Sequence, residues 1–114
     1  MEEIPKIGDF EAAILAAIES IGVENAYGVP IRHELNARLK RDVAVGALYT
    51  VLGRLEEKGL VRSWEGEKTA KRGGRAKRYY ALEGAGESAL HAKRQEHVQV
   101  GLALGLGMNS MGGA

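Results

Sequence analysis

Basic side chains and glycines gather in one short stretch of this chain, between residues 68 and 78. The stretch carries six basic residues and no acidic residue: Lys68, Lys71, Arg72, Arg75, Lys77 and Arg78. Positive charges at this density bind the phosphates of a nucleic acid, and arginine also enters a narrow minor groove. Arg75, beside Gly73 and Gly74, is expected to reach a minor groove. The residues expected to contact phosphates are Lys71, Arg72 and Lys77.

A second group of residues with binding chemistry lies upstream of this basic stretch. Small or hydroxyl-bearing residues stand where a surface helix normally carries Glu, Lys or Gln: Gly46, Ala47, Tyr49, Thr50 and Gly53. Small residues let a backbone approach another surface, and hydroxyl groups reach phosphates or base edges. Arg54 lies one turn further along, within reach of the same surface. Docking into a DNA groove is the favoured interpretation, and tight packing of the glycines on a neighbouring helix is the alternative.

Apolar spacing predicts the elements that position these two groups. One helix has a buried face formed by Leu48, Val51, Leu52 and Leu55. Gly59 is placed to end this helix, because glycine adopts the left-handed conformation at little cost. Strands over 60–64 and 77–82 then flank the basic stretch, which is the layout of a winged helix. Tyr79 and Tyr80 point to opposite faces of the second strand, so one of them is expected in the core.

Further helices and a tail complete the predicted organisation. Amphipathic spacing predicts helices over 9–20 and 29–39, and a more polar helix over 84–100. The predicted fold class is therefore mainly α with a small β-hairpin (α+β). The expected parts are a winged-helix DNA-binding domain over 1–82, a C-terminal dimerisation helix over 83–100 and a glycine-rich, disordered tail over 101–114.

Composition excludes several classes of protein. The chain has 114 residues, a net charge of +1 and no cysteine, so disulfides and thiolate sites are excluded. No apolar run approaches the roughly 20 residues of a membrane span, and the acidic start does not resemble a signal peptide. The three histidines are far apart in sequence or out of helical register, and no phosphate loop is present. We expect a cytoplasmic protein that is not an enzyme, with no cofactor, metal or membrane partner.

Two motifs resemble one known family of bacterial regulators. The run from Gly46 to Val61 contains a Leu-Tyr pair, an Arg-Leu-Glu triplet and a closing Gly-Leu-Val, and the wing ends in Gly74-Arg-Ala-Lys-Arg-Tyr-Tyr-Ala-Leu82. Residues 26–31 add a third likeness. Together these motifs resemble the PadR family of transcriptional regulators over about residues 8–90.

The resemblance implies a homodimeric winged helix-turn-helix repressor that binds double-stranded DNA at a palindromic operator. Gly46, Ala47, Tyr49 and Thr50 match the recognition-helix positions, and Tyr27 matches a phosphate contact. Dimer symmetry then requires recognition helices about 34 Å apart, one turn of DNA. The family often has a longer C-terminal region with an effector pocket. Here any pocket for a small-molecule effector has to form at the dimer interface, between the first and last helices.

Two alternatives stay open at this point. In one, the chain is a winged-helix protein-interaction module, in which the third helix docks a protein and the basic wing is incidental. In the other, it binds DNA constitutively without an effector. The salt dependence of binding separates the first alternative from a DNA-binding regulator, because neutralising several phosphates makes affinity fall steeply with ionic strength.

Overall fold

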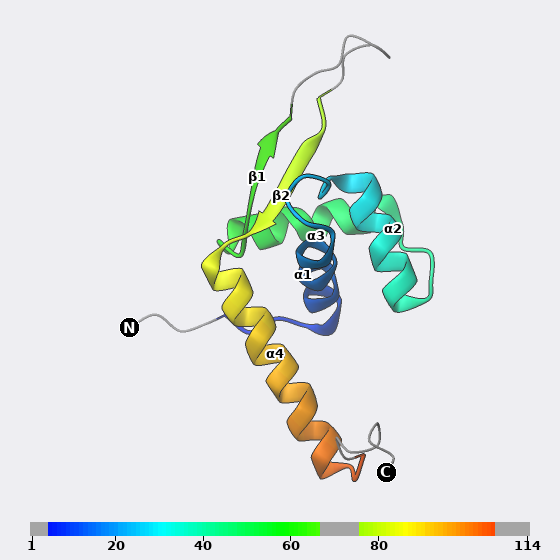
Figure 1. Cartoon of the computed structure of the whole chain (residues 1–114), viewed down its shortest axis with the longest axis vertical. Coiled ribbons are helices and arrows are strands. Elements are labelled where there is room, and N and C mark those ends of the chain that lie inside the picture. The colour runs from blue at the N-terminus through cyan, green and yellow to red at the C-terminus, as the bar shows by residue number, and fades with distance from the viewer. Residues whose placement is uncertain (1–4, 67–75, 107–114) are drawn as a thin grey trace.

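The computed structural model describes residues 5–66 and 76–106, which form four helices and one hairpin (Figure 1). In chain order the elements are α1 (Asp9–Ile21), α2 (Gly28–Leu39), α3 (Val45–Glu57), β1 (Val61–Glu65), β2 (Arg78–Leu82) and α4 (Gly84–Ala103). The predicted α+β class is confirmed. Helix α2 begins one residue earlier than expected, and each strand begins one residue later.

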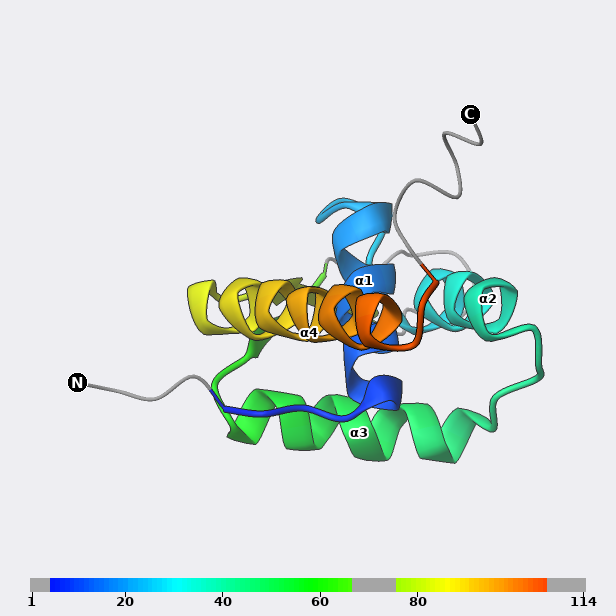
Figure 2. The same cartoon turned by 90° about the horizontal axis from the view of Figure 1, so that it is seen from below.

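The core lies between the first three helices and the base of the hairpin. Its fully buried side chains include Ile14, Leu15, Ile31, Leu35, Leu48, Leu52, Leu55 and Leu60. Each such side chain contributes about 1.5–3 kcal/mol when it leaves water. Because α3 puts one face into this core, its other face stays at the surface, along one side of the body (Figure 2).

Helix α3 ends where the sequence predicts. Gly59 has a φ of 77°, in the left-handed region. Its N–H donates to the Glu56 carbonyl at 3.0 Å, and the Leu60 N–H donates to the Leu55 carbonyl at 2.9 Å. These two bonds form a Schellman motif, in which buried Leu60 packs back toward the helix. The turn aims the chain directly into β1.

The hairpin is a two-stranded antiparallel sheet that projects from the helical body (Figure 1). Its register pairs Val61 with Leu82 and Trp64 with Tyr79. Tyr80 is buried in the core, whereas Tyr79 is half-buried, so the expected division between the two tyrosines is confirmed. The Tyr80 N–H donates to the Ala26 carbonyl at 2.8 Å. This bond ties β2 to the loop that leads into α2.

Helix α4 packs its first half on the body and extends its second half away from it (Figure 1). Ala89 and Leu90 are buried, whereas the residues after Val98 are largely exposed. The helix runs three residues past the expected end near Val100, so the prediction that the disordered tail begins at residue 101 was wrong for 101–103. Gly105, with a φ of 83°, forms the terminating motif instead, since Gly101 keeps helical geometry. None of the described helices has the length and apolar content that a bilayer crossing requires.

Candidate nucleic-acid interface

The exposed face of α3 carries all the recognition-helix residues that the sequence suggests. The exposed residues are Gly46, Ala47, Tyr49, Thr50, Gly53 and Arg54. A Cβ built on Gly46 or Gly53 would have no atom of another described element within 4 Å. The two glycines therefore do not serve packing on a neighbouring helix in this part of the chain, and the alternative interpretation loses its support. The face is left open for another molecule.

The first turns of α2 and α3 have free N–H groups and contain no acidic side chain. In the described part of the chain, no side chain caps α2 at Tyr27 or α3 at Ala44. Neither first turn contains an acidic residue, whereas α1 has Asp9 and Glu11 there. Exposed N–H groups and the positive end of the helix dipole favour an anion. Both first turns are thus compatible with a phosphate backbone nearby.

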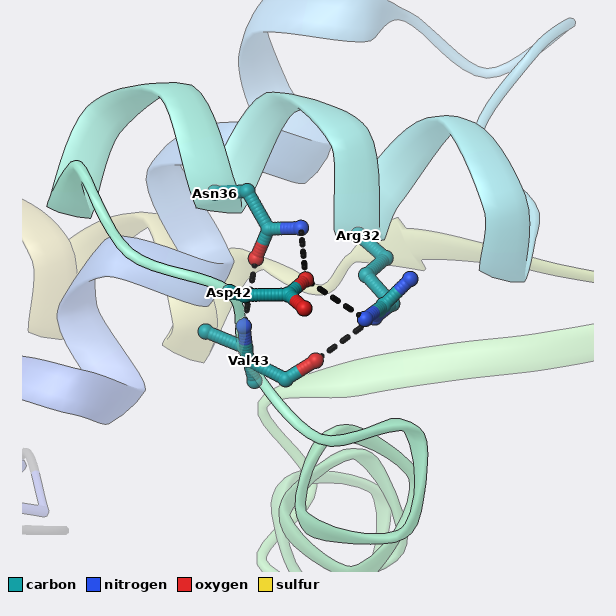
Figure 3. Close-up of polar contacts among 4 residues, drawn as sticks. All are labelled: Arg32, Asn36, Asp42 and Val43. Atoms are coloured by element: carbon teal, nitrogen blue, oxygen red, sulfur yellow. Dashed lines mark hydrogen bonds and ion pairs between the residues drawn. The ribbon is translucent and has the colours of Figure 1, made fainter.

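A polar network fixes the turn between α2 and α3 (Figure 3). The Arg32 Nε donates to the Val43 carbonyl at 2.6 Å, and its Nη2 donates to the Asp42 carboxylate at 2.8 Å. The Val43 N–H in turn donates to the Asn36 Oδ1 at 2.8 Å. These bonds satisfy both backbone groups of Val43, which leads into α3. The network therefore sets the direction in which α3 leaves the turn.

Tyr27 joins the start of α2 to the base of the wing. Its ring lies against Tyr79, with centroids 5.3 Å apart, and Tyr79 stacks on Trp64 at 6.1 Å. The Lys77 Nζ lies 4.4 Å from the centroid of the Tyr27 ring, within the range of a cation–π contact. The predicted sites Tyr27 and Lys77 are thus brought together at one corner of α2.

The other basic residues of the wing divide into two groups. Arg78 is exposed, and its guanidinium donates to Ser63 Oγ at 3.0 Å, while Ser63 donates to Glu56 at 2.8 Å. Arg78 therefore lies on the side of the sheet near the end of α3, away from the Lys77–Tyr27 contact. The predicted sites outside the described residues are Lys71, Arg72 and Arg75.

A family comparison gives this geometry its context. The model of the transcriptional regulator PadR-like family matches residues 14–92. The chain belongs to the PadR-like family of transcriptional regulators. The resemblance expected from the sequence motifs is thereby confirmed, and the matched residues include α3, the hairpin and the first half of α4.

Solved structures of several other proteins share the fold of this PadR-like chain. A PadR family transcription regulator from Clostridium difficile is 26% identical, with a TM-score of 0.65 over 88% of this chain and 100% of that one. The complex structure of hsRosR-S4 is 28% identical, with a TM-score of 0.62 over 82% and 72%. A regulator from Clostridium thermocellum, 21% identical, has a TM-score of 0.66 over 84% and 86%. A comparison with curated protein sequences gave no significant match.

Proposed function

We propose that this PadR-like chain is a sequence-specific DNA-binding regulator that represses transcription as a homodimer on a palindromic operator. The open face of α3 carries the proposal. Gly46 and Gly53 have free space above them, and small or hydroxyl-bearing side chains surround them. A helix with such a face brings its backbone close to base edges in a major groove.

In this proposal α3 reads the bases, and the groups around it hold the DNA backbone. The base-reading residues are Gly46, Ala47, Tyr49 and Thr50. The residues assigned to phosphates are Tyr27, Arg54, Lys71, Arg72, Lys77 and Arg78, with Arg75 entering the minor groove. The contact of Lys77 with Tyr27 and the uncapped first turns of α2 and α3 support this division.

The far half of α4 supports the homodimer in this proposal. Four large apolar side chains near its end are between 49% and 70% exposed: Val100, Leu102, Leu104 and Leu106. A helix with so little of its surface covered is seldom stable alone. A second copy of α4 would cover these side chains and set two α3 helices about 34 Å apart.

An effector, if the regulator has one, would bind beside α4. A groove of about 520 Å³ lies between α1 and α4 and is lined by Asp9, Ala12, Ala13, Lys93, Arg94, His97 and Val98. A second copy packed on α4 would close this open groove on its solvent side. The small-molecule effector of the proposal is assigned to this interface.

Selection of bound duplexes from a random DNA pool at two salt concentrations tests the proposed function. The expected result is an inverted repeat with half-sites about one helical turn apart, bound more weakly at the higher salt. Recovery of unenriched DNA that dissociates with salt would contradict sequence-specific binding. The winged-helix protein-interaction module would then be the better account of the α3 face.

A further inference from the structure

A small apolar hollow lies where the first turns of α2 and α3 meet. It has a volume of about 110 Å³ and is lined by Gly28, Val29, Arg32, Val45, Leu48 and Tyr49. Three of its apolar side chains are well exposed: Val29 at 73%, Val45 at 52% and Tyr49 at 46%. Since these side chains are not in the core, the stability of the fold does not account for them.

The Tyr49 ring forms one wall of this hollow. A Cβ built on Gly28 would overlap the Tyr49 hydroxyl oxygen, so the hydroxyl lies against the backbone of the first turn of α2. The phenol therefore points toward α2, and Tyr49 is one of the residues that line the hollow. This arrangement makes Tyr49 an apolar surface here more than a hydrogen-bonding group.

The surroundings of the hollow suit a nucleic acid. Its lining contains no acidic residue, and its one basic residue, Arg32, is paired with the Asp42 carboxylate at 2.8 Å. The two helix starts that frame it, at Tyr27 and Ala44, have no side-chain cap within the residues described and no acid in their first turns. An apolar hollow between the positive ends of two helix dipoles matches an apolar group carried on a polyanion.

The major groove of DNA offers one such group, the 5-methyl group of thymine. The first half of the exposed α3 face, from Val45 to Thr50, has no Asn, Gln, Arg or Lys for a bidentate contact to a base. We propose that Val29, Val45 and the Tyr49 ring form a receptor for thymine methyl groups, so that half-sites are selected largely by apolar contact. The inference rests on the proposed DNA-binding function and deepens it, because it names the base chemistry that is read.

Replacing thymine by uracil tests the inference, since uracil lacks only the methyl group. The site selected from a random pool is synthesised with uracil at each thymine position in turn, and its affinity for the full chain is measured. We expect a loss of about fourfold for each methyl group in contact, the value for burying one methyl-sized group. The Val29→Ala/Val45→Ala double variant should bind the thymine and uracil duplexes alike.

The control variant is Val23→Ala, because Val23 is also 52% exposed but lines a different hollow. It should keep the full sensitivity to uracil. Equal affinity of the unaltered chain for thymine and uracil duplexes would overturn the methyl receptor and leave the DNA-binding function standing. Failure to enrich any sequence from the pool would overturn both.

Discussion

Gly86, in the first turns of α4, lies directly against the backbone carbonyl of Leu60. A Cβ on Gly86 would collide with that carbonyl, which also accepts a hydrogen bond from the Glu83 N–H at 2.9 Å. The contact joins the start of α4 to the turn between α3 and β1. It therefore couples the helix proposed to form the dimer to the end of the helix proposed to read DNA.

Gly86→Ala should separate α4 from the body. Because the neighbouring Leu60 carbonyl is backbone, the clash is relieved only by moving α4, and we expect a loss of about 1–3 kcal/mol in the free energy of unfolding. Urea denaturation measures this loss. Gly84→Ala is the matched control, since a Cβ there has open space, and it should leave stability unchanged or raise it. Equal stability of the two variants would refute the close contact.

Asn36→Ala should weaken the turn between α2 and α3. It removes the acceptor of the part-buried Val43 N–H, which costs about 1–3 kcal/mol when a buried donor loses its partner. Because this turn aims α3, selectivity among DNA sequences should also fall. Arg38→Ala is the control, since Arg38 makes a surface pair with Glu34 that is worth about 0.3–0.5 kcal/mol and takes no part in the Val43 network. A variant as stable and as selective as the parent would show that the network does not position α3.

Arg72→Ala together with Arg75→Ala should weaken binding to all DNA sequences. Because Arg72 is assigned to a phosphate and Arg75 to the minor groove, the slope of log affinity against log salt should become shallower by about 1 or more, the value for one lost phosphate contact. Tyr49→Ala and Thr50→Ala should instead change the preference among sequences. Anisotropy titrations with selected and scrambled duplexes separate the two effects. Unchanged binding after the double substitution would show that the wing arginines do not contribute to DNA binding.

Acid should loosen the contact between α1 and α4. Hydrogen bonds from His97 and Lys93, each 3.2 Å from the Asp9 carboxylate, lower the pKa of Asp9 from its usual 3.8. A lowered pKa means that the stabilisation is present above pH 3.8 and is lost as the pH falls through the folded value. Asp9→Asn should therefore flatten the acid limb of a plot of melting temperature against pH. An unchanged acid limb would show that the contact contributes nothing in solution.

Local sequence patterns predict much of this fold. The stripe of Leu48, Val51, Leu52 and Leu55 and the glycine at 59 determine where α3 is buried and where it ends, because both signals act within one or two helical turns. The alternation of Tyr79 and Tyr80 likewise predicts one core tyrosine. The glycine-rich composition after Val100 misled the prediction for the end of α4, since a glycine such as Gly101 can keep helical geometry, whereas Gly105 adopts a positive φ.

Contacts between residues that are distant in sequence cannot be predicted from such local patterns. From the sequence, Arg32 is interpreted as a solvated charge on the outside of α2. In the structure it binds Val43 and Asp42 across the turn. The close approach of Tyr49 to Gly28 joins two helices and has no local signature. Val29, by contrast, could have been predicted as an exposed apolar residue, because it lies off the buried stripe of Ile31 and Leu35. The structure places it beside α3.

Affinity as a function of half-site spacing tests the central claim most directly. The selected inverted repeat is compared with duplexes that carry 5 extra base pairs between the half-sites, about half a helical turn. A homodimer with two α3 helices about 34 Å apart should lose most of its specific affinity, because the second half-site then lies on the opposite face of the DNA. Affinity that does not depend on the spacing would contradict paired recognition helices and leave a chain that binds each half-site alone.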